Sequence, residues 1–484
     1  MRRAKFGNVS VMSESPKKNN FDTGKDLYDD MNKNNAYFEG LNQKLYNSIP
    51  DSARNILELG GGSGRLGKLF KENHPGSKWT NIDKDRLSIE QSKAYLDCSI
   101  LQDLNCSSLF LKDFSLFDVV ILGDFLEHMI NPEKILKDLY DVTTDNAKII
   151  CCLPNAAHVS VLQRLMCGDM SYDECGLLDS THYHFFSQQS AFKIFLDTGW
   201  LPALKDHYMT PVSENVFTRN LINGVSMLGV PEKTALRYLF TYQMIISCQK
   251  YIIKSDKSKI GEKRISVIVP VNRRWQYELN ILRSPGLKEI DAEIFPVEDA
   301  SSAAEAYLIG KLKTKNQWTL FAHQDVYFPA GSGHRLIKEI DILEEAGKID
   351  APVGFAGIAK HQDSTMAYSG LVVDRIKLFN YPGTDNAITI DEFAILLHKD
   401  AKVVIDDKLG WHTWATDLCL QASIDPQMHN ASIIRVPVFH NSLGDFLPLE
   451  ALSESYHLCA DVLLNKYPHL NEIHTLCGTL RQKK

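Results

Sequence analysis

Residues 55–72 read NILELGGGSGRLGKLFKE, and this stretch decides the fold of the first half of the chain. A short apolar run, 56–59, precedes four glycines, and leucine and phenylalanine side chains at helical spacing follow them. The order predicts a strand, a tight turn and a helix. Glycine lets a ligand approach the turn backbone, and the helix N-terminus offers free N–H groups. The stretch therefore predicts a cofactor-binding turn.

Further candidate residues come at the ends of later predicted strands. WTNIDKD, 79–85, ends a second strand with Asp83, and ILQDLN, 100–105, contains Asp103. FDVVILGDFLEHMINPEKIL, 117–136, runs from a third strand into Gly123 and a Glu-His pair. Carboxyl ends of parallel strands share one edge of a sheet, so these residues and the glycine turn are expected to form one site.

Together these motifs resemble the class I S-adenosylmethionine-dependent methyltransferases over residues 40–205. The resemblance implies a Rossmann-like fold in which Asp83 holds the cofactor ribose and Asp103 lies by the adenine. It also implies that the methionine end of the cofactor is bound, at and around the glycine turn, by Glu58, Gly60, Gly62, Gly64 and Gly123. The alternative is a dinucleotide-binding domain, which more often shows GxGxxG than the ExGxGxG found here.

The methyl acceptor is harder to predict. DSTHYHFFSQQSAFKIFLDTGW, 179–200, resembles the late segment of the same family, where a His-rich strand and loop precede a helix. His128, His182 and His184 are candidate bases for an acceptor hydroxyl, because imidazole accepts a proton near neutral pH. Alternate residues of a strand face opposite sides, so at most one of His182 and His184 would face the acceptor. O-methylation is the expected reaction.

The remaining domain boundaries follow from composition and spacing. Residues 1–39 are expected to be an N-terminal extension. Residues 206–262 lack strand alternation and predict a helical bridge followed by a charged linker, KSDKSKIGEKR.

A second α/β series begins at RISVIVPVN, 264–272. Further strands are expected at 292–299, 318–328, 353–360 and 401–407, with helices at 302–314 and 334–347. This alternation predicts a doubly wound sheet with a site at the carboxyl ends of its strands, where FAHQDVYF places His323 and Asp325. An Asp there can hold a divalent cation that binds a diphosphate.

Later segments supply further candidate residues. IDDKLGWHTWATDLCLQASI, 405–424, contains Asp406, Asp407, His412 and Asp417, and VFHNSLG ends a last strand on His440. The two aspartates at 406 and 407 are equally well explained as solvated turn residues. Trp411 and Trp414 could stack on a sugar ring or simply pack with His412.

The second series resembles the family 2-like glycosyltransferases of the GT-A fold, particularly a group first noted in streptomycin biosynthesis clusters, over residues 264–445. The resemblance implies a nucleotide-sugar site at Asp299, His323 and Asp325, with Asp325 and His440 as ligands of a divalent cation, Mn or Mg. It makes Asp417 the general base. Two departures are HQD in place of Asp-x-Asp and Leu308 where a polar residue is expected. The glycosyltransferase domain is expected over 263–450, with a helical tail at 451–484.

Composition limits the class of protein. The chain has 484 residues, 44% of them hydrophobic, and a net charge of −7, which points to two or three globular domains and to no nucleic-acid partner. Ten cysteines without a CxxC pair, and no run of about 18 apolar residues, predict a cytoplasmic protein with reduced thiols and no transmembrane segment. Peripheral membrane attachment stays open.

The sequence thus predicts an α/β protein, with a Rossmann-like methyltransferase domain followed by a GT-A-like domain. The expected function is a bifunctional transferase of glycan biosynthesis. It would use S-adenosylmethionine and a nucleotide-sugar donor on a glycan or glycosylated small-molecule acceptor. In one alternative the C-terminal domain is a non-catalytic glycan- or nucleotide-binding module, and in another the chain is mainly a scaffold.

Overall fold

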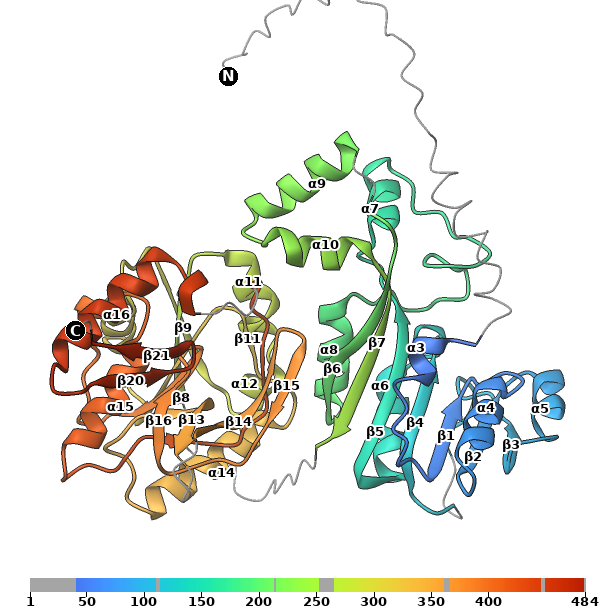
Figure 1. Ribbon diagram of the computed structural model, residues 1–484, viewed down its shortest axis with the longest axis horizontal. Helices are drawn as coiled ribbons and strands as arrows, with labels where there is room; N and C mark the ends of the chain where they lie inside the picture. Colours follow the sequence, from blue (N-terminus) through green and yellow to red (C-terminus); the bar gives the residue numbers. More distant parts are fainter. Residues whose placement is uncertain are drawn as a thin grey trace, which may run out of the picture. The chain divides into compact units, whose positions relative to one another are not determined.

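A computed structural model describes residues 41–109, 114–212, 215–251, 265–360, 366–444 and 449–482 (Figure 1). Contacts divide the chain into residues 1–43 and residues 44–484. Within the second unit we call 44–251 the N-terminal lobe and 265–482 the C-terminal lobe. The expected N-terminal extension and the linker at 254–264 lie outside the described residues.

The N-terminal lobe is built on a seven-stranded sheet of order β3-β2-β1-β4-β5-β7-β6. Its strands are β1 (Asn55–Leu59), β2 (Lys78–Asp83), β3 (Cys98–Leu101), β4 (Phe117–Gly123), β5 (Thr143–Pro154), β6 (Trp200–Met209) and β7 (Thr241–Lys250). The strands β1 to β5 run parallel, and β7 runs antiparallel to both β5 and β6. The strand order reverses between β1 and β4, which is where ligands bind in open α/β sheets.

Apart from one short helix that precedes β1, the helices of this lobe follow its strands, as the alternating pattern predicts. They are α3 (Gln43–Tyr46), α4 (Arg65–Asn73), α5 (Arg86–Ser92), α6 (Pro132–Asp141), α7 (Val159–Met166), α8 (Gln188–Asp197), α9 (Val216–Met227) and α10 (Glu232–Phe240). Asn131 caps α6 by accepting the backbone N–H of Lys134, and Pro132 occupies the first turn, where a missing N–H costs nothing. The predicted α/β class and the Rossmann-like arrangement are confirmed for this lobe.

Two sequence predictions in this lobe were wrong. The expected helical bridge at 206–262 contains α9 and α10, but β6 continues to Met209 and β7 fills 241–250. Both strands pair within the main sheet, so the lobe extends past residue 205 to at least 250. The expected His-rich strand around His182 and His184 is irregular chain, and only the helix after it, α8, is present.

The C-terminal lobe contains two six-stranded arrays. In the first the order is β18-β12-β17-β10-β8-β9, and in the second it is β11-β19-β14-β13-β16, with β15 beside β14. The first array comprises β8 (Ile265–Val271), β9 (Glu293–Glu298), β10 (Trp318–Ala322), β12 (Val353–Gly354), β17 (Ala394–His398) and β18 (Ser432–Ile433). The second comprises β11 (Val326–Tyr327), β13 (Ala356–Lys360), β14 (Met366–Asp374), β15 (Lys377–Asn380), β16 (Ala387–Ile390) and β19 (Val438–His440).

The first array is mixed, because β10 runs parallel to β8 but antiparallel to β17. The helices of the lobe are α11 (Arg274–Leu279), α12 (Pro285–Glu289), α13 (Ala303–Lys311), α14 (Ser332–Glu345), α15 (Trp414–Ile424) and α16 (Glu454–Lys466). An α/β architecture with several sheets is thus confirmed for this lobe, and a GT-A fold stays a prediction.

Two further predictions for this lobe were wrong. Residues 401–407 form no strand, and β17 lies just before them. The expected helical tail is α16 followed by a hairpin of β20 (Glu472–Thr475) and β21 (Gly478–Arg481). The tail is also part of the core, because Leu463 of α16 and Leu480 of β21 are buried in one cluster with Trp414.

Within the described part of the chain, no helix has both the length and the apolar character needed to cross a bilayer. The ten cysteines form no disulfide, and Cys151 and Cys152 lie buried in β5.

The packing of α4 against β2 generates a stability prediction. A Cβ added at Gly67 would lie 2.6 Å from the Trp79 Nε1 atom, whereas one at Gly224 in α9 would meet nothing within 4 Å. Gly67→Ala should lower the free energy of unfolding by about 1–3 kcal/mol through overpacking. Gly224→Ala should raise it by about 0.5–1 kcal/mol, because alanine favours a helix interior. Urea unfolding followed by circular dichroism measures both, and a Gly67→Ala protein as stable as wild type would contradict the described packing.

Candidate functional site

The glycine-rich turn lies between β1 and α4 in the N-terminal lobe. Gly60, Gly62 and Gly64 have φ values of 72°, 51° and 73°, a backbone region that other residues rarely adopt. A Cβ at Gly60 would come within 2.7 Å of the Phe125 ring, whereas a Cβ at Gly62 would meet nothing within 4 Å. The turn therefore needs glycine for its conformation, and it is open on the side of Gly62.

Asp83, at the end of β2, reaches this turn. Its Oδ2 accepts the backbone N–H of Gly62 at 2.8 Å, and its Oδ1 accepts that of Asp85 at 2.8 Å. The two residues meet because β1 and β2 are parallel neighbours in register, with Leu59 opposite Ile82. The structure thus brings together the two features that the sequence predicted to share a site.

Glu58 lies beneath the turn. Its carboxylate accepts the indole N–H of Trp79 at 2.9 Å, and a Cβ at Gly61 would meet that carboxylate at 2.5 Å. Burial raises the pKa of Glu58 to about 7, and Asp83 adds to the rise, although the bond from Trp79 opposes it. The Glu58 carboxylate therefore packs against the glycine turn at Gly61.

Asn81 was missed by sequence reasoning. Its side chain is fully buried, and its Nδ2 donates to the Gly62 carbonyl at 2.9 Å, while its Oδ1 has no hydrogen-bond partner among the described residues. A polar residue in the middle of an apolar strand, TNI, was the available signal.

The loops after β3 and β4 are tied to each other. Asp103 accepts the backbone N–H of Asn105 at 2.9 Å. The Asn105 side chain in turn donates to the His128 carbonyl and accepts the backbone N–H of Ile130. Gly123 ends β4, and a Cβ there would lie 2.9 Å from a Leu45 methyl group. Asp103 therefore belongs to the same edge of the sheet as His128.

Two of the three predicted histidines come together. The rings of His128 and His182 are 4.8 Å apart in an edge-to-face arrangement, and burial lowers the pKa of His182. His184 points elsewhere, with its Nε2 at 3.3 Å from the Ile130 carbonyl and its ring against Phe186. Glu127, the acid of the predicted Glu-His pair, lies beside the first two histidines.

In the C-terminal lobe, His323, Asp325 and His440 form a second cluster. One ligand atom from each lies within 4.8 Å of the others. The cluster forms because β11 pairs antiparallel with β19, which places Val326 opposite His440. Asp325 Oδ1 is buried and has no hydrogen-bond partner in the described residues.

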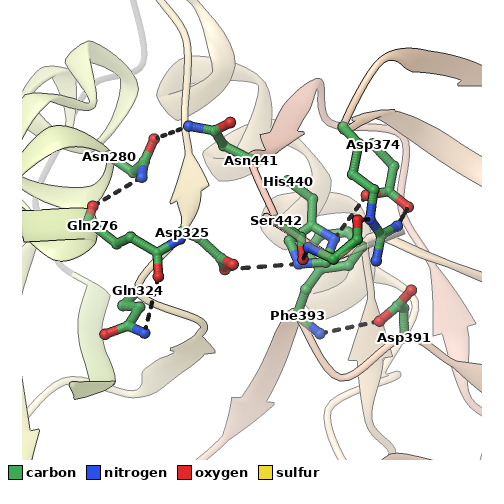
Figure 2. A network of polar contacts seen from close by, with 12 residues as sticks. Gln276, Asn280, Gln324, Asp325, Asp374, Asp391, Phe393, His440, Asn441 and Ser442 are labelled. Carbon is green, nitrogen blue, oxygen red and sulfur yellow. Dashed lines mark hydrogen bonds and ion pairs between the residues drawn. The ribbon is translucent and has the colours of Figure 1, made fainter. Parts of the chain in front are cut away.

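His440 lies between two carboxylates (Figure 2). Its Nε2 is 3.7 Å from Asp325 Oδ1, and its Nδ1 is 3.1 Å from Asp374 Oδ1. Burial alone lowers the pKa of His440, but Asp374, Asp325 and Asp391 together raise it to about 9. Burial lowers the pKa of His323 to about 4, so this ring offers a neutral nitrogen.

Gln324, the middle residue of HQD, has a positioning role. Its Oε1 accepts the backbone N–H groups of Asn272 and Arg273, which follow β8, and its Nε2 donates to Asn272 Oδ1. This ties the end of β10 to the end of β8.

Asp417, the predicted general base, lies in the core. It is fully buried and accepts hydrogen bonds from Tyr467 Oη at 2.8 Å, Lys466 Nζ at 2.9 Å and Gln421 Nε2 at 2.6 Å. This arrangement favours a structural role, joining α15 to α16, over proton transfer.

Asp391 and Glu392 are carboxylates that the sequence analysis missed. Burial raises the pKa of Asp391, which also acts electrostatically on His440. Burial and Asp391 raise the pKa of Glu392 to about 8, although it accepts backbone N–H groups at the start of α15. Two acids directly before the apolar run of β17 were the signal.

The other predicted residues are spread around this lobe. Asp299 is exposed in the turn after β9, with a φ of 59°. Leu308 on α13 is exposed, whereas Trp414 is buried against Phe321, so it packs and does not offer a stacking face. Asp406 binds Lys466 at 2.8 Å.

Part of the N-terminal lobe is similar to a known protein family. Residues 31–201 match the family described as "Methyltransferase domain". No curated protein matches the chain. The matched stretch contains the glycine turn and Asp83.

Solved structures that are similar to part of this chain share 12–15% of its sequence. A SAM-dependent methyltransferase from Archaeoglobus fulgidus is 15% identical, with a TM-score of 0.32, over 44% of this chain and 97% of that one. A complex of the Haloferax volcanii Trm112 methyltransferase activator with a putative methyltransferase gives 12% identity and a TM-score of 0.31, over 47% and 94%. The YcgJ protein from Bacillus subtilis gives 13% and 0.31, over 43% and 97%.

The buried carboxyl group of Glu58 generates a pH prediction. Its pKa is raised from 4.5 to about 7, so the folded protein keeps a proton that the unfolded chain releases between these values. Its contribution to stability is complete below pH 4.5 and is lost as the pH rises through 7. Glu58→Gln replaces the titrating carboxyl group with a neutral amide, so this loss of stability at higher pH does not occur in the variant. The free energy of unfolding of Glu58→Gln minus that of wild type should therefore grow by about 3 kcal/mol from pH 4.5 to 7. If urea unfolding gives a stability difference between the two proteins that does not change with pH, the raised pKa of Glu58 is refuted.

Proposed function

We propose that the N-terminal lobe transfers a methyl group from S-adenosylmethionine to an acceptor hydroxyl, and that the methyltransferase domain extends over residues 40–251. The observation that carries this proposal is the bond between the Gly62 N–H and the Asp83 carboxylate, at the edge where the strand order reverses. The open space above Gly62 gives a cofactor access to the backbone.

In this proposal each group of residues at the site has its own role. When bound, S-adenosylmethionine supplies a methyl group activated by its sulfonium charge. The backbone of Gly60, Gly62 and Gly64 holds the methionine end over the Glu58 support, and Asp83 accepts hydrogen bonds from the ribose hydroxyls. Asp103 and Gly123 line the same edge. Glu127, His128 and His182 would bind the acceptor hydroxyl at this edge, and the proton that the hydroxyl loses on methylation would pass to this group.

The ribose contact gives a direct test. Asp83→Asn should weaken binding of S-adenosylmethionine roughly ten- to a hundredfold, because a hydrogen bond to a charged group contributes about 1.5–3 kcal/mol. Isothermal titration calorimetry measures this effect. Asp85→Asn, which changes only the cap of α5, is the matched control and should bind normally. Unchanged affinity in Asp83→Asn, or no binding to wild type, would contradict the proposal.

For the C-terminal lobe we propose a metal-dependent glycosyltransferase that uses a nucleotide-sugar donor and a glycan or glycosylated small-molecule acceptor. Asp325 Oδ1, which has no hydrogen-bond partner among the described residues, and the neutral ring of His323 fit a divalent cation, Mn or Mg, and His440 would join them by releasing its proton to the solvent. When bound, such an ion neutralises the diphosphate of the donor. Asp391, whose pKa burial raises, is better placed than Asp417 to accept the proton of the acceptor hydroxyl. Asp299 would bind the nucleoside.

A second candidate function follows from the burial of Asp417. If no carboxylate acts as base, the C-terminal lobe is a non-catalytic module that binds glycan or nucleotide. In the first proposal both lobes act in one process, glycan assembly in the cytoplasm, and the N-terminal lobe methylates the product of the C-terminal lobe.

One experiment distinguishes a glycosyltransferase from a non-catalytic binding module. Wild type incubated with Mn²⁺ and a panel of nucleotide sugars should release nucleoside diphosphate slowly, and Asp325→Asn or His440→Gln should lower the rate at least about tenfold. His429→Gln, an exposed histidine bound to Asp350, is the matched control. Binding of a nucleotide sugar without release supports the binding module, and no binding under any condition contradicts both.

A further inference from the structure

A separate group of ligating side chains lies after β4 in the N-terminal lobe. Glu127 and His128 belong to the short helix η1 (Leu126–His128), and His182 belongs to the irregular segment before α8. One ligand atom from each residue lies within 4.8 Å of the other two. The segment holding His182 is fixed here by its backbone, since the N–H groups of Tyr183 and His184 both donate to the Glu127 carbonyl.

Glu127 carries an unmatched buried oxygen. Its side chain is 1% exposed, and its Oε2 has no hydrogen-bond partner within the described ranges. No lysine or arginine in those ranges forms an ion pair with it. The carboxylates of Asp124 and Asp179 lie close enough to add to the rise in the Glu127 pKa that burial causes. A buried polar group of this kind requires a partner.

The hydrogen bonds of His128 leave its Nε2 available as a ligand atom. Its Nδ1 is 3.2 Å from the Thr181 carbonyl and 3.1 Å from Thr181 Oγ1. The carbonyl can only accept, and the Thr181 hydroxyl donates its proton to Asp179 at 2.6 Å. Nδ1 therefore carries the ring proton, and the lone pair is on Nε2. A backbone carbonyl that fixes one ring nitrogen in this way is typical of metal-ligating histidines.

His182 offers the third ligand atom. The residue is 9% exposed, and its Nδ1 is buried with no hydrogen-bond partner in the described part of the chain. The ring interacts with the Leu177 backbone, which leaves Nδ1 as the free nitrogen. Two orphaned buried atoms, Glu127 Oε2 and His182 Nδ1, thus lie in the same small group.

We propose that Glu127, His128 and His182 bind a divalent first-row transition-metal ion. Two imidazoles and one carboxylate favour such an ion over Mg²⁺ or Ca²⁺, which prefer all-oxygen sites. Three protein ligands leave coordination positions for a further oxygen ligand. Under the proposed function that ligand is the acceptor hydroxyl, and this role rests on that proposal, whereas cation binding does not.

The test is a titration of the full chain with Co²⁺, followed by its visible absorption bands. The Asp325→Asn/His440→Gln double variant serves as the background, so that the cluster in the C-terminal lobe does not contribute. This background should bind one Co²⁺, and Mg²⁺ should not displace it. Adding Glu127→Gln or His182→Gln should weaken binding by about tenfold or more.

His184→Gln is the matched control, because it lies two residues from His182 but outside the group, and it should leave Co²⁺ affinity unchanged. Circular dichroism of each variant shows whether it is folded, and the two ligand variants provide independent tests. The inference is overturned if the background binds no Co²⁺, or if folded Glu127→Gln and His182→Gln proteins bind it as tightly as the background. Calorimetry with S-adenosylmethionine on the same proteins tests the proposed function separately, since cofactor binding can fail while the cation still binds.

Discussion

The hydrogen bond from the Gly62 amide to the Asp83 carboxylate is the constraint on which the N-terminal lobe depends. It holds the turn after β1 against the end of β2, while the Asn81 side chain holds the carbonyl of the same glycine. The glycine turn and the Asp83 carboxylate therefore share one edge of the sheet. Because the strand order reverses between β1 and β4, the loop that carries Glu127 and His128 reaches that edge too.

Those parts of the fold and site that rest on local pattern could be predicted from the sequence. Spaced glycines between an apolar run and a helical repeat were enough to predict β1, the turn and α4, and Asp83 followed from its place at the end of the next strand. The order of His323, Asp325 and His440 along the chain was also informative. Their meeting depends on the pairing of β11 with β19, which no local pattern reveals.

Other features depend on partners far away in the sequence. The apolar residues of β7 are buried almost continuously, so their spacing did not distinguish a strand from the helix expected there. Asp417 looks like a base at the start of a helix, but Tyr467 and Lys466, about fifty residues on, bind its carboxylate. Asn81 was missed, and the burial of Asn81 and Glu127 without a full set of hydrogen-bond partners is visible only in the structure.

The central claim is that the glycine turn and the end of β2 bind S-adenosylmethionine. Hydrogen–deuterium exchange of the full chain, with and without S-adenosylhomocysteine, tests it most directly. The account predicts slower exchange for the amides of residues 60–64 and 83–85, and little change in the C-terminal lobe. Unchanged exchange at the turn under saturating ligand, or protection confined to other segments, would contradict it.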